Sequence, residues 1–185
     1  MSVSPAGNAQ ALALRSTVER DIDQLMRWFL DEPSIRVWGG PKFRYPFTRH
    51  SFLEDIHWGR TDAFSLCGGN DRLAAFGQLY VHHQRINLAR LVVDPARRGR
   101  GIGKLLIHRL LATGREIFEC REYSLFVFRD NEQALRCYRS MGFRISSYPE
   151  DTPLGNECYY LTRPVELPRT DYLGLKTTTG GNNVE

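Results

Sequence analysis

The chain has 185 residues, of which 42% are apolar and 25% are charged. This length supplies one hydrophobic core and is too short for two comfortable domains, and the composition excludes a disordered or fibrous chain. The formal net charge of +4 is mild, so a basic pocket for one phosphorylated ligand explains it as well as a nucleic-acid surface does.

The cysteines predict neither a metal site nor a disulfide framework. Cys67, Cys120, Cys137 and Cys158 are widely spaced and form no C-x-x-C pair. We therefore expect free thiols in a reducing cytoplasm, and no metal. Residues 1–10 lack the basic and apolar segments of an export signal, and no stretch is long enough to span a bilayer, so we expect no membrane partner.

The first third of the chain predicts a strand and two helices. A short strand is expected over residues 11–15, and Ser16 and Glu19 have the spacing of a capping box for a first helix. Thr48 is the expected cap of a second helix. Between the helices, residues 38–47 form the least regular stretch, an aromatic loop with glycine and proline.

The middle of the chain predicts strands that lead into a glycine-rich turn. Alternating apolar residues indicate strands over residues 63–67 and 73–81, joined as a hairpin, and a third strand over residues 86–93. Three alternating glycines, the last of them inside the first turn, then mark the start of a long helix over residues 102–117. This order is typical of an anion site, because the first N–H groups of a helix have no partner and glycine lets a phosphate approach them.

The last part predicts two more strand and helix signals. A strand over residues 123–128 precedes a helix over residues 131–141 that ends at Gly142, and strands near residues 143–147 and 157–162 follow. A hairpin followed by strands linked through helices predicts an α/β or α+β domain on one mixed sheet.

We place the boundaries of this domain from composition. The domain is expected over residues 11–164, after a flexible N-terminus of residues 1–10. Residues 165–185 are polar and lack apolar periodicity, which predicts a flexible tail.

The spacing of the glycines excludes two common nucleotide motifs. Gly99, Gly101 and Gly103 do not form G-x-G-x-x-G, because Lys104 stands where the last glycine would be. A P-loop fails as well, because Leu105 follows the lysine in place of serine or threonine.

Two motifs instead resemble those of the GNAT acetyltransferases. Residues 98–103 (R-G-R-G-I-G) match the family's coenzyme A pyrophosphate loop, [Q/R]-x-x-G-x-[G/A], and residues 131–143 match its N-x-x-A-x-x-x-Y-x-x-x-G-F motif. The resemblance is specific over residues 86–143 and looser elsewhere. It implies a mixed, mostly antiparallel sheet of six to seven strands flanked by about four helices.

The resemblance also implies a set of site residues. The pyrophosphate of acetyl-CoA would lie on backbone N–H groups, the pantetheine arm would add to the strand before the loop, and the N–H of Val93 would stabilise the oxyanion. Tyr138 would protonate the departing thiolate or be a plain core tyrosine, and Asn131 would bind the coenzyme or cap its helix. The residues implied to contact the coenzyme are Leu91, Val92, Val93, Arg98, Gly99, Arg100, Gly101, Ile102, Gly103, Lys104, Asn131 and Tyr138. A solvated basic face is the alternative for Arg97, Arg100 and Lys104.

The general base is not assigned by these motifs. Asn87 and Phe126 stand where relatives often carry a glutamate, and neither can act as a base. His82 and His83 have a suitable intrinsic pKa, but neighbours on a strand point to opposite faces, so at most one would reach a cleft, and a pair in a surface turn is the alternative. The remaining candidates are Glu54, Asp55, His57 or a water chain.

The implied function is transfer of an acetyl group from acetyl-CoA to a primary amine, by direct attack in a ternary complex. The acceptor is a small molecule or a protein N-terminus, and residues 38–47 would shape its side of the cleft. The alternative is a module that binds acyl-CoA as a sensor or regulator without catalysis. We expect no nucleic-acid partner, because the basic residues form one short loop. The sequence leaves open the acceptor and the choice between monomer and homodimer.

Overall fold

The computed structural model describes residues 11–150 and 154–166. The N-terminus expected to be flexible, residues 1–10, and residues 167–185 of the expected tail lie outside the described residues. Val165 and Glu166 belong to the described part: the Val165 N–H donates to the Arg121 carbonyl at 2.8 Å, and Arg163 donates to Glu166 at 2.7 Å. The chain is therefore bonded to the domain for two residues past the expected boundary.

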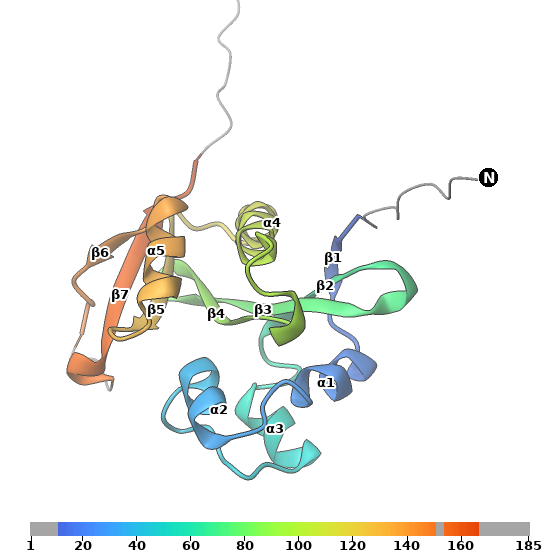
Figure 1. The fold of residues 1–185 in the computed structure, drawn as a ribbon. Coiled ribbons are helices and arrows are strands. Elements are labelled where there is room, and N and C mark those ends of the chain that lie inside the picture. The colour runs from blue at the N-terminus through green and yellow to red at the C-terminus, as the bar shows by residue number, and fades with distance from the viewer. Residues whose placement is uncertain (1–10, 151–153, 167–185) are drawn as a thin grey trace, which may run out of the picture.

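A seven-stranded sheet runs through the molecule in the order β1-β2-β3-β4-β5-β7-β6 (Figure 1). Neighbouring strands are antiparallel except β4 and β5, which are parallel. This confirms the predicted mixed, mostly antiparallel sheet. The strands are β1 (Ala13–Ser16), β2 (Asp62–Cys67), β3 (Leu73–His82), β4 (Arg85–Val93), β5 (Glu122–Phe128), β6 (Arg144–Ser146) and β7 (Cys158–Pro164).

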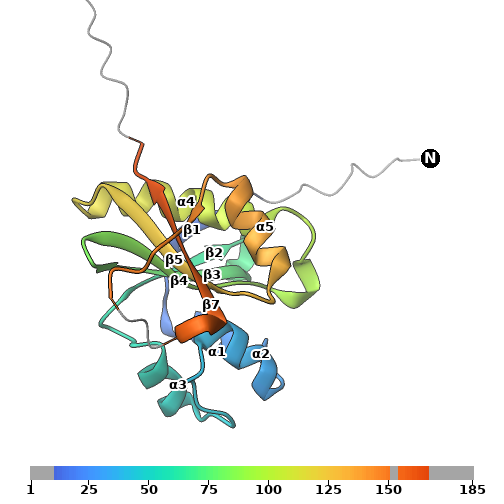
Figure 2. The ribbon, with the colours of Figure 1, turned by 90° about the vertical axis from the view of Figure 1, so that its left-hand side faces the viewer.

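Helices cover both faces of the sheet. Helices α4 and α5 lie on one face and α1, α2 and α3 on the other, as Figures 1 and 2 show from two sides. They are α1 (Glu19–Met26), α2 (Glu32–Gly39), α3 (Arg49–Asp55), α4 (Ile102–Ile117) and α5 (Glu132–Ser140). The four expected helices are all present, and α2 is an additional one. It begins where Asp31 accepts a hydrogen bond from the Ser34 N–H at 2.8 Å, with Pro33 in the first turn.

The capping box predicted at Ser16 is wrong. Ser16 is the last residue of β1, and α1 starts after Val18, whose N–H donates to the Asp21 carboxylate at 3.0 Å. Asp21 is fully buried and forms an ion pair of 2.6 Å with Arg15. Burial alone would raise the pKa of Asp21, but these bonds hold it below its usual value. The buried Asp21 carboxylate, paired with the partly exposed Arg15 and bonded to the Val18 N–H, therefore fixes this helix start, which a spacing pattern does not reveal.

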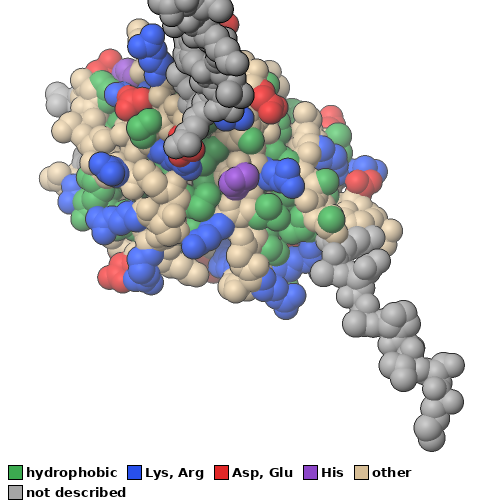
Figure 3. All heavy atoms as spheres, turned by 90° about the horizontal axis from the view of Figure 1, so that it is seen from above, with side chains coloured by type: hydrophobic (Ala, Val, Ile, Leu, Met, Phe, Trp, Pro, Cys, Tyr) green, Lys and Arg blue, Asp and Glu red, His purple; other side chains and the backbone are tan. Residues whose placement is uncertain are grey.

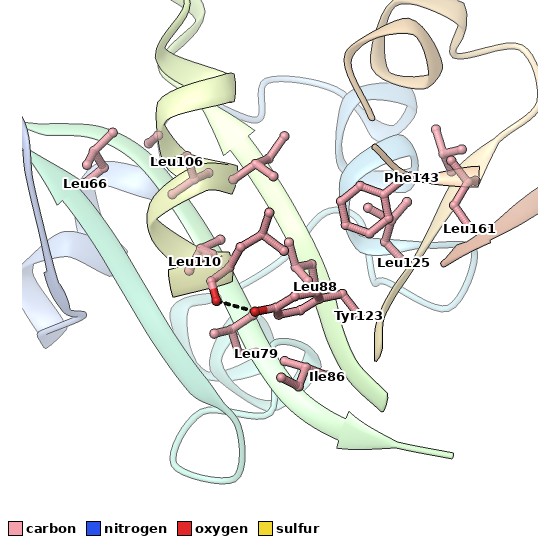
Figure 4. Packing of buried hydrophobic residues seen from close by; sticks show 14 residues of the cluster. Leu66, Leu79, Ile86, Leu88, Leu106, Leu110, Tyr123, Leu125, Phe143 and Leu161 are labelled. Carbon is pink, nitrogen blue, oxygen red and sulfur yellow. Dashed lines mark hydrogen bonds between the residues drawn. The ribbon is translucent and has the colours of Figure 1, made fainter. Parts of the chain in front are cut away.

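The sheet carries a separate hydrophobic layer on each face. Between α4 and the sheet, leucines of the helix pack on β3, β4 and β5, and the Tyr123 hydroxyl donates to the Leu111 carbonyl at 2.5 Å (Figure 4). On the opposite face, Phe52 of α3 and Phe76 of β3 are fully buried among the residues of α1 and α2. Each such side chain stabilises the fold by roughly 1.5–3 kcal/mol. The packing of α4 fixes the position of the glycine-rich turn that precedes it.

Within the described residues, no helix combines the length and the apolar character needed to span a membrane.

On the face above α4 and α5, lysine and arginine side chains are spread among apolar and polar ones (Figure 3). Cys67, Cys120, Cys137 and Cys158 are free thiols, as predicted.

Candidate functional site: a cleft where the sheet opens

The sheet opens between its two parallel strands. β4 and β5 pair at Ile86 with Tyr123 and at Asn87 with Ser124, and no further pairs follow along the strands in the described sheet. The second half of β4 therefore faces an opening instead of a neighbouring strand. Asp94 N–H donates to the Ala74 carbonyl on β3 at 2.9 Å, and successive N–H groups of a strand point in opposite directions. The N–H of Val93 consequently points away from β3, toward the opening.

A bulge in β4 lies beside this opening. Gln78 of β3 pairs with Ala89, and the register then shifts by one residue around Arg90, whose φ is +51°. The extra residue turns the Arg90 side chain to the face of α1, α2 and α3, where it reaches the carbonyl of Asp55 at the end of α3. The sequence carries a signal for this bulge in the spacing of the apolar residues of β4 that face α4. Ile86 and Leu88 are two positions apart, as in a regular strand, whereas Leu88 and Leu91 are three apart across Arg90.

The opening widens into a cleft of about 1110 Å³. We call its two sides the loop wall (residues 91–104 together with Asn131 and α5) and the aromatic wall (Trp28, Phe29, Trp38, Tyr80, Arg90 and Phe126). The structure brings eleven of the twelve predicted coenzyme residues to this cleft, all on the loop wall: Leu91, Val92, Val93, Arg98, Gly99, Gly101, Ile102, Gly103, Lys104, Asn131 and Tyr138. The exception is Arg100, which is exposed and does not line the cleft.

The glycine-rich turn presents bare backbone to the cleft. Gly99 and Gly101 have φ values of +76° and +77°, which favour glycine, and no protein atom lies within 4 Å of the place where a Cβ would stand. Gly101 is the N-cap of α4 and brings no side chain to cap it. The N–H groups of Ile102, Gly103 and Lys104 therefore have no partner inside the helix, and with the helix dipole they can hold a phosphate group.

Positive side chains stand around this turn. Arg97, Arg98 and Lys104 line the cleft, whereas Arg100 is exposed and does not, so a coenzyme contact stays a prediction for these residues and a solvated surface fits Arg100. Arg97 is partly neutralised by Asp94, whose carboxylate lies 3.7 Å away. The charge of the loop wall suits an anion.

Two residues of the second motif lie on α5 and at its start. The Asn131 side chain accepts a hydrogen bond from the Ala134 N–H at 3.2 Å, which confirms its role as a helix cap. Tyr138 lines the cleft about two helical turns after Asn131, and burial raises the pKa of its phenol. A phenol that stays protonated at neutral pH can give a proton to a departing anion.

Neither of the two usual glutamate positions supplies a base. Asn87 and Phe126 both line the cleft, and the Asn87 amide oxygen accepts a hydrogen bond from the Ser124 hydroxyl at 3.2 Å. Tyr80 pairs with Asn87 across the strands, and burial raises the pKa of its phenol. A phenol with a raised pKa is protonated at neutral pH and is not a ready base.

The other base candidates lie away from the cleft. The prediction that His82 and His83 point to opposite faces is wrong, because both rings contact the hydroxyl of Tyr148, at 2.8 and 3.1 Å. His83 has a φ of +47° and belongs to the turn after β3, where the alternation of a strand no longer applies. Neither histidine lines the cleft, nor do Glu54, Asp55 and His57.

The aromatic wall was largely missed by the sequence analysis. Trp38, Gly39 and Gly40 line the cleft, as expected for the segment 38–47, but Phe43 and Phe47 pack into the layer between α1, α2 and α3. Trp28, Phe29, Tyr80 and Arg90 were not predicted, because they come from separate elements and share no spacing.

The family is shown by comparison with known proteins. A family model described as "Acetyltransferase (GNAT) family" matches residues 22–143, which is more than half of the chain. The chain therefore belongs to the GNAT acetyltransferase family. This membership agrees with the seven-stranded sheet opened between β4 and β5 and with the uncapped start of α4.

Curated relatives match over parts of the chain. A mycothiol acetyltransferase of Gordonia bronchialis is 40% identical over 78 residues, which cover 40% of this chain and 24% of the relative. A spermine/spermidine N(1)-acetyltransferase of Bacillus subtilis is 31% identical over 62 residues, which cover 34% of this chain and 41% of the relative. The chain thus spans less than half the length of these two relatives.

Solved structures match over most of the fold. The spermidine N-acetyltransferase of Vibrio cholerae, in complex with CoA and spermine, has a TM-score of 0.66 at 19% identity and covers 85% of this chain and 96% of its own. The ribosomal-protein-S18-alanine N-acetyltransferase of Escherichia coli has a TM-score of 0.61 at 20% identity, with coverage of 87% and 98%. At these identities the likeness shows the fold.

Proposed function

We propose that this protein transfers an acetyl group from acetyl-CoA to a primary amine of a small molecule or a protein N-terminus. The observation that carries the proposal is one cleft that joins the uncapped start of α4 to the open edge of β4. The first feature suits a pyrophosphate and the second suits an extended amide chain, and coenzyme A carries both.

The residues of the loop wall fit this coenzyme. The N–H groups of Ile102, Gly103 and Lys104 would hold the pyrophosphate, and the empty space above Gly99 and Gly101 leaves room for its oxygens. The open edge of β4 would receive the pantetheine arm as an added strand, with the acetyl group at its end near Val93.

The same residues supply the chemistry of direct transfer. The amine nitrogen attacks the thioester carbon, the N–H of Val93 stabilises the oxyanion, and the carbon–sulfur bond breaks as the carbon–nitrogen bond forms. Tyr138 donates its proton to the departing thiolate and recovers one from solvent. The proton of the amine leaves to water, which is easiest for an α-amino group, since its pKa of about 8 lies near neutrality.

A specific observation favours a second candidate, an acyl-CoA sensor without catalysis. Asn87 and Phe126 occupy the cleft where a carboxylate base would stand, and the described lining of the aromatic wall holds no aspartate or glutamate. A cytoplasmic location and the absence of a nucleic-acid partner stay predictions from the sequence.

Release of free thiol from acetyl-CoA tests the proposal and separates these candidates. The assay takes a panel of polyamines, aminoglycosides, amino acids and N-terminal peptides, with thermal shift by coenzyme A measured alongside. Thiol release with one class of acceptor supports the enzyme. Stabilisation by coenzyme A without release supports the sensor, and the absence of both signals contradicts both proposals.

A further inference from the structure

Arg90 is a positive group in the aromatic wall with unused hydrogen-bonding capacity. One Nη donates to the Gln78 amide oxygen at 2.9 Å, and the other donates to the backbone carbonyl of Asp55 at 2.7 Å. The Nε–H is buried and has no hydrogen-bond partner in the described structure. A guanidinium has five N–H donors, so this N–H and one hydrogen on each Nη form no hydrogen bond among the described residues.

The charge of Arg90 is not neutralised by a direct ion pair. Both of its acceptors are uncharged, and the carboxylate of Asp55 is engaged by Arg44 at 2.7 and 3.0 Å. Burial lowers the pKa of Arg90, which reports the cost of removing this charge from water, although a guanidinium stays protonated. An anionic group of a ligand would offset that cost.

The position of Arg90 is fixed and lies close to the expected reaction centre. The Trp38 indole donates to the Arg90 carbonyl at 2.7 Å, which holds the bulge against α2. Arg90 precedes Val93 by three residues on β4, and a strand rises about 3.3 Å per residue, so the two lie within roughly 10 Å. One small molecule can therefore reach both.

Apart from the Tyr80 hydroxyl and the indole N–H groups, the rest of the aromatic wall is apolar. Trp28, Phe29, Trp38 and Phe126 line the same cleft as Arg90, and among the described lining residues the one carboxylate, Asp130, comes just before α5 on the loop-wall side. A polycation would meet Arg90 there without a facing carboxylate, whereas an apolar body would bury its surface against these rings.

We propose that the acceptor is an amine that carries a carboxylate and an apolar body, a zwitterion of the amino-acid class, whose carboxylate pairs with Arg90. This inference rests on the proposed acetyl transfer and names the chemistry of its acceptor. It separates this protein from the relatives named for polyamines, whose acceptors carry several positive charges.

Matched ligands test the inference on the unmodified protein. L-phenylalanine and phenethylamine, or L-leucine and 3-methylbutylamine, differ by one carboxylate. Binding to the protein with coenzyme A is followed by thermal shift and by the fluorescence of the tryptophans in the wall, with spermidine as the polycation. A charge-assisted hydrogen-bonded pair predicts binding about 10-fold to 100-fold tighter for the member with the carboxylate.

Two variants assign the effect to Arg90. Arg90→Gln is expected to remove the preference for the carboxylated member, whereas Arg85→Gln is expected to keep it. Arg85 is the matched control, because it lies on the same strand, carries the same charge and bonds to Glu122 outside the cleft. Should Arg90→Gln fail to fold, the ligand pairs on the unmodified protein decide the question.

The outcomes separate this inference from the proposed function. Equal responses to both members of each pair, including no response, overturn the inference, as does tighter binding of spermidine. Either result leaves acetyl transfer standing if coenzyme A binds and a plain amine releases thiol. Failure of coenzyme A to bind contradicts acetyl transfer itself.

Discussion

In the proposed function, the two walls of the cleft would recognise their ligands by different means. The loop wall works through backbone N–H groups that a short segment exposes, because Gly99 and Gly101 adopt positive φ and leave the start of α4 bare. The aromatic wall works through side chains that four or more separate elements bring together, with Arg90 as its charged member. A site made of backbone groups can be predicted from the spacing of residues in one short segment. A wall made of side chains from several elements forms only when the chain folds.

The largest expected effect is on the loop wall. Gly101→Glu would place a side chain at a φ of +77°, at a strain of about 1–2 kcal/mol, and would set a negative group where the pyrophosphate should lie. We expect the affinity for coenzyme A to fall by about 100-fold or more, measured by calorimetry.

Gly59→Glu is the control for this substitution. Gly59 has a φ of +75° and equally open surroundings, but it lies in the turn before β2, away from the cleft. The Gly59→Glu substitution imposes the same backbone strain, so the melting temperature of this variant should fall as far as that of Gly101→Glu. Its affinity for coenzyme A should stay unchanged. Normal coenzyme binding by a folded Gly101→Glu protein would contradict the assignment of the loop.

A smaller effect is expected at Tyr138, on the α5 part of the loop wall. Tyr138→Phe removes the phenol that burial keeps protonated, and loss of a general acid costs about 100-fold in turnover at the low end of the usual range. Affinity for coenzyme A should change little, because the ring remains. Tyr159→Phe is the control, since its ring lies under Arg129 outside the cleft. Unchanged turnover of Tyr138→Phe would remove Tyr138 from this role.

The contrast between the walls also explains what the sequence could predict. Strands β2 to β5 and helix α4 follow from apolar periodicity, and the loop wall follows from glycine spacing. The start of α1 was misplaced because the buried carboxylate of Asp21, which bonds to Arg15 and to the Val18 N–H, outweighs a spacing pattern. The contact of His82 and His83 with Tyr148 joins residues 65 or more positions apart, which no local pattern reports.

The bulge at Arg90 is an intermediate case. Its signal is present as a change of phase in the apolar residues of β4, but the signal gives only an extra residue and not the direction of the side chain. That direction depends on Gln78 and on the end of α3, which lie on other elements. A site residue can therefore be visible in the sequence as an irregularity while its role is set by tertiary contacts.

The smallest expected effect separates the walls most directly. Trp38→Phe keeps an aromatic ring in α2 but removes the 2.7 Å hydrogen bond to the Arg90 carbonyl. A lost hydrogen bond of this kind costs about 1 kcal/mol, so the melting temperature should fall by about 2–4 °C. The loosened bulge should raise the KM for the acceptor by about fivefold.

Trp58→Phe is the control, because Trp58 packs on the same side of the sheet without lining the cleft. The affinity for coenzyme A should stay unchanged in both variants, because neither touches the loop wall. A loss of coenzyme affinity in Trp38→Phe alone would show that the two walls are coupled through β4 and do not act separately.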